Sequence, residues 1–216
     1  MGGGYVARIG RDIAIELCVK YHYMHRVSPC SRAYGLIREN NIVGVCIYGV
    51  PPSSTLLKGV CGDDEMYNVY ELNRLWVSDD EPRNAESFLV GNSIRDLDRE
   101  IIVSFSDTKA GHVGYIYQAT NFIYCGLSAE FKDPIVKGFE GMHHATYAHG
   151  MSKREIIETY GEDRVTYVDR PRKHRYVYFN AKGKRWKQLR SKLKYEQLPY
   201  PKGDTRRHTI DEAFDY

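Results

Sequence analysis

The sequence predicts a mixed α/β fold, in which helices flank a central sheet whose N-terminal part is antiparallel. Some segments show the alternation of apolar residues typical of strands, and others show helical spacing. The predicted order is helix, hairpin, strand, helix, strand, helix, strand, and such a core packs helices against a parallel or mixed sheet. The composition agrees, because 42% hydrophobic and 27% charged residues exclude a chain that is disordered throughout.

The N-terminal part is predicted to form one helix and one hairpin. Residues 12–20 have helical spacing with an acidic residue near the start. The patterns over residues 33–37 and 42–50 predict strands, and the second is rich in β-branched side chains. The polar stretch 38–41 between them is typical of a hairpin turn. Two prolines then end this unit.

The middle of the chain alternates strands with helices. Residues 69–77 predict a strand, and strict alternation along it places Leu72, Arg74 and Trp76 on one face and Glu71, Asn73 and Leu75 on the other. The elements predicted after it are a helix over 85–98, a short buried strand over 101–105 and an amphipathic helix over 115–124.

The C-terminal part carries the positive charge of the chain. The net charge of +3 hides a segment, 170–207, in which fourteen Lys and Arg face two acids, giving +12 and leaving −6 over residues 1–169 and −3 at the tail. Aromatic residues are interleaved with these cations, and such clusters bind phosphate backbones and stack on unpaired bases. The alternative is a solvated helix face. The further predicted elements are a helix over 152–160, a strand over 176–179 and a helix over 183–193.

We therefore expect an acidic core over 1–169 and a basic strand and helix over 170–216 that packs on it and contacts nucleic acid. The first ten residues lack the apolar core of a signal peptide, and the chain has no apolar run of 18 residues, so neither export nor membrane insertion is expected. Five scattered cysteines without a C-x-x-C pair predict reduced thiols rather than a zinc site.

The predicted strand, loop and helix around residue 84 form a candidate phosphate site. The exposed N–H groups at the start of a helix can hold a phosphate, and Asn84 and Ser87 add polar side chains there. The segment lacks the glycine-rich turn of a Rossmann or Walker loop, so an ordinary helix N-cap is the alternative.

Three kinds of titratable side chain are candidates for a reaction centre. His22 lies in the stretch YHYMH, and histidine is both poised near neutral pH and a frequent metal ligand. Asp107 follows a short apolar strand, where α/β proteins gather site residues, although a loop aspartate can simply close an Asx turn. Tyr117 falls on a predicted helix, where tyrosine is more often a core residue. A second candidate metal cluster, of unusual spacing, is His143, His144 and His149.

Three blocks of sequence resemble the Mom family of phage DNA-modification proteins, on a layout similar to the GNAT acyltransferase fold. They are ELNRLWV with NAESFLVG, VSFSDTKAGHVGYIYQATNFIYCG, and KHRYVYF with LPYPKG. The resemblance implies an enzyme that installs a small carbamoyl-containing group, derived from acetyl-CoA, on the exocyclic amine of adenine in phage DNA and so evades host restriction. It also implies iron and action in the host cytoplasm. GNAT proteins often pair through antiparallel edge strands, so a homodimer stays open, although nothing in the sequence demands it.

The resemblance implies a role for each matching residue. It places His22, Tyr23, Asp107 and Tyr117 in the reaction centre and assigns acyl-CoA binding to Arg74 and Ser87. From its place at the helix start, Asn84 is expected to join the cofactor site, and we expect the implied iron to lie among His22, Asp107 and neighbouring tyrosines. The usual GNAT pyrophosphate turn is absent, since NAESFLVG stands in its place. From the charge pattern, the residues expected to bind double-stranded DNA are Lys184, Arg185, Lys187 and Arg190.

Two other functions stay open on the sequence alone. One is a GNAT N-acyltransferase that acts on a protein or small-molecule amine, with the basic tail serving solubility. The other is a DNA-binding module that keeps the scaffold without turnover. The basic, tyrosine-rich C-terminal part argues against the first, and the long middle block argues against the second.

Overall fold

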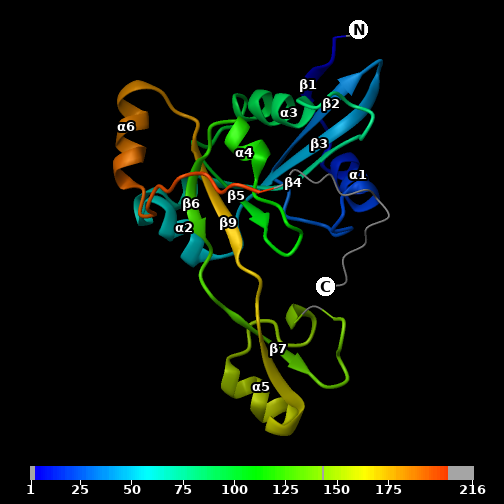
Figure 1. Cartoon of the computed structure of the whole chain (residues 1–216), viewed down its shortest axis with the longest axis vertical. Helices are drawn as coiled ribbons and strands as arrows, with labels where there is room; N and C mark the ends of the chain where they lie inside the picture. Colours follow the sequence, from blue (N-terminus) through cyan, green and yellow to red (C-terminus); the bar gives the residue numbers. More distant parts are fainter. Residues whose placement is uncertain (1–2, 143, 204–216) are drawn as a thin grey trace.

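A central seven-stranded sheet organises the chain in a computed structural model that describes residues 3–142 and 144–203 (Figure 1). The strands lie in the order β1-β2-β3-β4-β5-β9-β6, and every neighbouring pair is antiparallel except β4 and β5. The predicted mixed α/β class is thereby confirmed. The strands are β1 (Tyr5–Arg8), β2 (Arg32–Arg38), β3 (Asn41–Gly49), β4 (Val69–Val77), β5 (Ile101–Asp107), β6 (Ile123–Leu127) and β9 (Lys173–Phe179).

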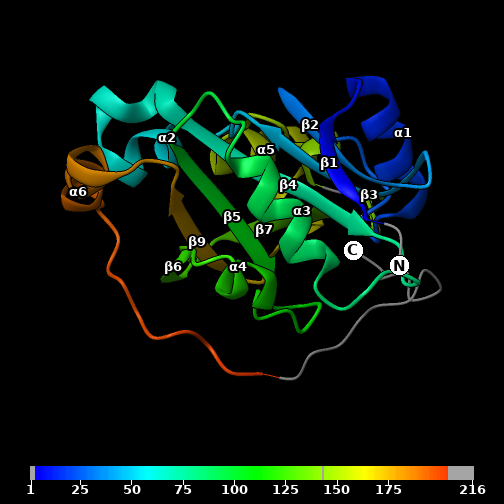
Figure 2. The same ribbon diagram turned by 90° about the horizontal axis from the view of Figure 1, so that it is seen from above.

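Helices cover both faces of this sheet (Figure 2). On one face α3 and α4 pack over a cluster that takes its side chains from alternate positions, such as Tyr34 of β2 and Tyr48 of β3. On the other face α1 packs over Ala33 and Val45, while α2 and α6 cover β5 and β9. The helices are α1 (Arg11–Tyr21), α2 (Ser54–Cys61), α3 (Ala85–Ile94), α4 (Tyr115–Ala119) and α6 (Gly183–Lys192).

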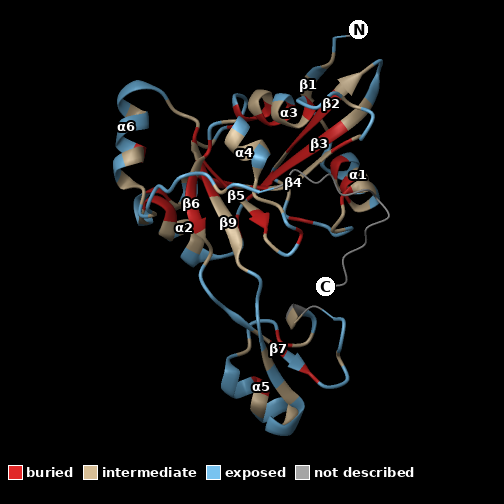
Figure 3. Ribbon diagram, in the orientation of Figure 1, coloured by how far each residue is buried: buried red, intermediate tan, exposed pale blue. Residues whose placement is uncertain are grey.

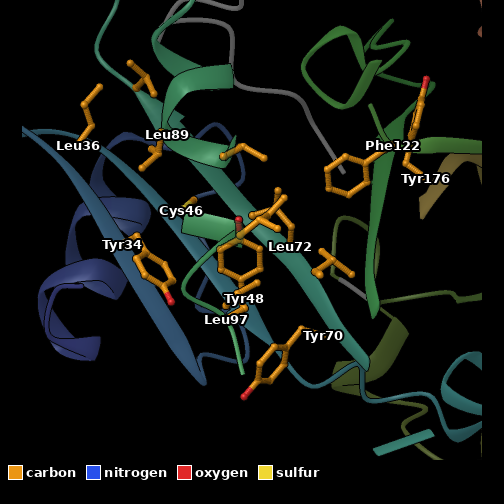
Figure 4. Close-up of a cluster of buried hydrophobic side chains, with 14 of the residues drawn as sticks. Tyr34, Leu36, Cys46, Tyr48, Tyr70, Leu72, Leu89, Leu97, Phe122 and Tyr176 are labelled. Carbon is orange, nitrogen blue, oxygen red and sulfur yellow. The ribbon is translucent and has the colours of Figure 1, made fainter. Parts of the chain in front are cut away.

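Tyrosines fill much of the core, which explains part of their abundance. Tyr34, Tyr48 and Tyr176 are at most 2% exposed, and Figure 4 shows them with Phe122 and Leu72 in the cluster under α3. The buried residues lie along the middle strands and on the inner faces of the helices (Figure 3). A hydroxyl in such a core must find a partner, and that of Tyr48 lies 2.7 Å from the Ser93 hydroxyl.

Several predicted elements differ from the structure. The helix predicted over 85–98 ends at Ile94, and the one predicted over 115–124 ends at Ala119. Asn121 has a φ of +61°, a left-handed conformation that stops the second helix, and the chain then enters β6. Strict helical spacing does not reveal such a turn. The strand β1 and the helix α2 were not predicted, because one is only four residues long and the other follows two prolines.

A small lobe projects from the sheet between β6 and β9 (Figure 1). It consists of β7 (Lys132–Val136) and β8 (Val165–Asp169), which pair with each other, and α5 (Lys153–Tyr160). Its own core centres on Val136, Ala148 and Ile156. A capping box begins α5, since the side chains of Ser152 and Glu155 each accept a hydrogen bond from the other residue's backbone N–H.

The basic helix α6 is fixed to the body by ion pairs. The guanidinium of Arg185 lies 2.8 Å from a carboxylate oxygen of Glu65 and 2.7 Å from one of Glu100. The ammonium of Lys192 lies 2.8 Å from Glu65, and Leu189 is fully buried beneath the helix. These contacts lower the pKa of Glu65 to about 2, chiefly through the hydrogen bond from Arg185.

The predicted division at residue 169 stays a prediction. The segment after it enters the sheet as β9, which lies between β5 and β6, so its backbone is shared with the body. Part of the predicted basic segment, including Arg206 and Arg207, lies outside the described residues. Within the described part of the chain, every helix is too short or too polar to cross a lipid bilayer.

We expect Arg185→Met to lower the free energy of unfolding at pH 7 by about 1–3 kcal/mol, because it leaves the buried Glu65 with fewer partners in a site that water partly screens. Glu65 has a lowered pKa, so its contribution is present above its ordinary pKa and is lost as the pH falls towards about 2. Urea titrations from pH 7 to pH 2 should show a smaller acid loss in the variant. An unchanged unfolding free energy would contradict this anchoring role, and Lys184→Met, on the exposed face, is the control.

Candidate functional site

The parallel strands β4 and β5 pair only at their start. Ladder pairs run from Val69 with Ile101 to Leu72 with Ser104, and the Ser104 hydroxyl donates a hydrogen bond of 3.0 Å to the Leu72 carbonyl. Beyond this pair β4 continues to Val77 and β5 to Asp107 without pairing to each other. Past this point, the backbone N–H and C=O groups that each of these strands directs towards the other form no ladder hydrogen bonds between β4 and β5.

A β-bulge at Asn73 corrects the predicted faces of β4. Arg74 pairs with Ile47 and Leu72 with Tyr48, so Asn73 is an extra residue opposite one position of β3. Leu72 and Leu75 consequently pack in the same cluster under α3, which strict alternation had excluded. Glu71 and Arg74, predicted on opposite faces, are close enough to influence each other's charge on the α1 side.

His22 and Tyr23 follow α1 on that same side of the sheet. The His22 side chain is buried at 7% exposure, and its ring stacks on that of Tyr23 at a centroid distance of 4.4 Å. The Met24 N–H donates to His22 Nδ1 at 3.2 Å, so a neutral ring carries its proton on Nε2. Burial, reinforced by Arg74, lowers the pKa of His22 to about 3. His22 is therefore a neutral hydrogen-bond donor at pH 7.

Asp107 ends β5 and is 5% exposed. Its Oδ1 accepts the Lys109 N–H at 2.9 Å, which is the Asx turn that the sequence left as an alternative, and its Oδ2 lies 3.8 Å from Lys173 Nζ. Its carbonyl accepts the His112 N–H, and the His112 ring contacts Tyr23 edge-on at 5.8 Å. The loop that Asp107 shapes thus reaches the His22–Tyr23 pair.

Tyr117, on α4, lies on the face of the sheet opposite to His22. It is close to the point where β4 and β5 stop pairing, which we call the β4–β5 divergence. Its ring packs between Phe122 and Tyr176, at centroid distances of 5.4 and 5.2 Å. Its hydroxyl hydrogen-bonds Ser104 at the last β4–β5 pair, and burial raises its pKa above the usual value. At neutral pH this hydroxyl keeps its proton.

The short helix α4 is held by its neighbours rather than by its own length. The Gln118 amide donates to the carbonyls of Val113 and Pro201, at 3.1 and 3.2 Å, and to the Tyr176 hydroxyl at 3.3 Å. Gly114, which caps the helix, has a φ of +76°, and a Cβ there would lie 2.6 Å from the Tyr176 ring. This packing fixes the direction of Tyr117.

Asn84 and Ser87 lie at the start of α3, apart from the His22 group. The Ser87 hydroxyl donates to the Asn84 carbonyl at 3.0 Å, and the Asn84 side chain makes no capping hydrogen bond within the described residues. Arg74 lies on the α1 side instead, where its Nη1 donates to the Asn73 carbonyl and its Nε is buried without a partner among the described atoms. Within the described part of the chain, no contact joins the three residues that are expected to bind acyl-CoA.

The four predicted DNA-binding residues divide into two pairs. Lys184 and Lys187 are exposed on the outer face of α6, beside Trp186, whereas Arg185 makes the ion pairs that fix the helix and Arg190 donates to Gln197. Their role in DNA binding stays a prediction. Of the second histidine cluster, His143 lies outside the described residues, and His144 contacts Asp133 and Arg170 in the lobe.

The donor set does not fit the implied iron. Across residues 3–142 and 144–203, no three His, Cys, Asp or Glu side chains gather so that they could hold a metal ion. The lone pair of His22 Nδ1 is taken by Met24, and Asp107 binds its own loop. We therefore derive no step through iron.

Glu71 is the titratable residue that sequence reasoning missed. It is the single acid in the strand VYELNRLWV, and this isolated charge is the sequence signal that could have indicated it. Strict alternation placed Glu71 and Arg74 on opposite faces of the strand. The bulge at Asn73 puts both side chains on the same face.

Comparisons with known proteins give a family match and several similar structures. The Mom protein family matches residues 4–202. The chain is 27% identical over 197 residues to the methylcarbamoylase mom of Escherichia phage Mu, covering 84% of this chain and 76% of that protein. Similar solved structures include a GNAT-family acetyltransferase from Bacillus cereus ATCC 10987 (12% identity, TM-score 0.45, 84% of this chain and 100% of that one). An N-acetyltransferase from Staphylococcus aureus Mu50 is 8% identical (TM-score 0.46, 83% and 99%).

We expect the His22 imidazole to stay neutral down to about pH 4, because burial and Arg74 both disfavour its charged form. Since the unfolded chain binds that proton near the ordinary histidine pKa, His22 should reduce stability progressively as the pH falls below about 6.5. Proton–nitrogen NMR correlations of the ring should show the proton on Nε2 and none on Nδ1 at pH 7. A titration midpoint near 6.5 would contradict the buried placement.

Proposed function

The chain belongs to the Mom protein family, and on this premise we propose that it is a transferase that modifies phage DNA. More specifically, we propose that it transfers a small carbamoyl-containing group, derived from acetyl-CoA, to the exocyclic amine of adenine. The phage Mu relative, named a methylcarbamoylase, supports a carbamoyl-type group. We further propose that the reaction takes place on DNA in the host cell.

The observation that carries the proposal is the divergence of β4 and β5, with polar groups brought to it from both faces. Tyr117 reaches the last ladder pair from the α4 side, whereas His22, Tyr23 and Arg74 gather on the α1 side. An extended thioester donor inserted between the strands would form hydrogen bonds with the backbone N–H and C=O groups that are left without a β4–β5 partner. The acceptor amine would then approach from the α1 side.

The start of α3 is proposed to hold the phosphates of the donor. The N–H groups of a first helical turn and the helix dipole both favour a phosphate. Ser87 and Asn84 lie at this turn, and the Asn84 side chain forms no capping hydrogen bond to the helix within the described residues. A short loop joins β4 to α3. The donor would therefore run from the α3 start towards Tyr117.

Tyr117 is proposed to protonate the leaving thiolate. Its raised pKa keeps the hydroxyl protonated at neutral pH, and its ring is fixed by Phe122 and Tyr176. On the other side, the neutral His22 ring offers its Nε2–H as a donor, and Tyr23 stacks on it. Asp107 shapes the loop that brings His112 to this pair.

The target adenine is proposed to leave the duplex before it reacts. A base inside the stack is out of reach, and flipping it out costs a few kcal/mol. The exposed Lys184 and Lys187, with Trp186 between them, would contact the phosphate backbone along α6.

Nucleoside mass spectrometry of DNA co-expressed with the protein tests the proposal. We expect a mass-shifted deoxyadenosine, reduced roughly 100-fold or more by Tyr117→Phe, which removes the proton donor but keeps the ring. Tyr178→Phe, a hydroxyl removed from another ring that packs on Phe122, is the control and should retain activity. Unmodified DNA together with acylated protein or small amines would instead identify a general N-acyltransferase.

DNA affinity measured against salt concentration tests the role of α6. We expect Lys184→Gln with Lys187→Gln to weaken binding to all sequences and to reduce the slope of log K against log salt by about 2, since each phosphate contact contributes roughly 0.9. The matched control, Lys153→Gln with Arg154→Gln, removes two exposed cations from α5 in the lobe. Equal losses in both double variants, or no loss in the first, would remove α6 from the DNA interface.

A further inference from the structure

Glu71 occupies the apex of the β4–β5 divergence. It pairs with Val103 on β5 and Gly49 on β3, one position before the last ladder pair, Leu72 with Ser104. Leu72 packs under α3, so Glu71 points to the α1 side, where Arg74 also lies. A carboxylate thus stands where the two strands begin to separate.

This carboxylate has no structural partner within the described residues. No hydrogen bond or ion pair is formed by its oxygens there, whereas Glu65, Glu81 and Glu100 are all ion-paired. The charged groups that influence it are Arg74 on its own strand and Lys173 on β9, and it in turn influences Tyr117 of α4. Burial is the largest effect and raises the pKa of Glu71 despite both cations.

A half-buried acid that stabilises nothing calls for a functional explanation. Lys173 already lies 3.8 Å from Asp107, and the Nη1 of Arg74 is taken by the Asn73 carbonyl. The neighbouring Arg74 Nε–H is buried and also lacks a partner among the described atoms. An acceptor and a donor, both unsatisfied, therefore face the same side of one strand.

We propose that Glu71 is the general base that removes a proton from the acceptor amine during the transfer. The inference rests on the proposed function, whose reaction it completes. An amine conjugated to a purine ring is a weak nucleophile, because its lone pair is delocalised, and a positioned base offsets this weakness. The unsatisfied Arg74 donor suits the ring nitrogen that adjoins such an amine.

The step balances with a thioester donor whose acyl group is already the complete transferred group, with its carbamoyl nitrogen in place. The amine nitrogen forms a bond to the carbonyl carbon as its N–H bond breaks, and the proton passes to Glu71. The carbon–sulfur bond breaks, and the thiolate takes the proton of Tyr117. Exchange of one proton from Glu71 to Tyr117, through water, restores both groups, so the products are the modified base and the free thiol.

Glu71→Gln tests the assignment in the nucleoside assay, with the rate of deoxyadenosine modification as the readout. We expect the rate to fall roughly 100-fold or more, and Glu71→Asp to recover part of it. The wild-type rate should fall on the acid side as Glu71 becomes protonated, and this limb should be absent in Glu71→Gln.

Thermal unfolding separates a catalytic role from a structural one. Because burial disfavours the charged form of Glu71, Glu71→Gln should leave the Tm unchanged or higher at pH 7. The control, Glu81→Gln, removes a carboxylate that is 10% exposed and paired with Arg38, so it should lower the Tm and retain activity.

Two outcomes overturn the inference. Undiminished modification by Glu71→Gln excludes Glu71 as the base, and a large drop in Tm shows that its role is structural. Wild-type protein that leaves DNA unmodified overturns the proposed function itself, so the two failures are distinguishable.

Discussion

The structure depends on one interruption of hydrogen bonding, the end of the β4–β5 ladder at Leu72 and Ser104. Parallel strands normally continue to pair, because unpaired backbone groups in a sheet interior are costly. Here each strand keeps its outer neighbour, β3 or β9, and loses only the inner one. The outer ladders supply the stability, and the inner groups remain available for a ligand.

The residues around this opening are held by packing and by local hydrogen bonds. Gln118 and Tyr176 fix the five-residue α4, while the turn after α1 fixes His22 through the Met24 N–H. Burial keeps His22 neutral and Tyr117 protonated, so both offer hydrogen-bond donors at neutral pH. An electrophile that develops negative charge suits such surroundings. The proposed acid and base thus approach one point from opposite faces.

Much of the fold follows from sequence pattern, whereas the site depends on irregularities that pattern does not contain. The bounds of β4 agree with the sequence because its run of β-branched, aromatic and other apolar residues predicts a strand, but the extra residue Asn73 reverses the faces after it. The helix at Tyr115 was recognised, yet its end at Ala119 depends on a left-handed Asn121. In α6, charge counting could not separate the exposed Lys184 from the ion-paired Arg185, since the acidic partners of Arg185 lie 85 and 120 residues away in the sequence.

A donor that lies between β4 and β5 must protect their backbone, and hydrogen–deuterium exchange with and without coenzyme A measures this protection. We expect slower exchange on addition of coenzyme A in residues 73–77, 104–107 and 84–88, with the β2–β3 hairpin unchanged. Protection confined to other segments, or saturable binding without protection in β4 and β5, would contradict it.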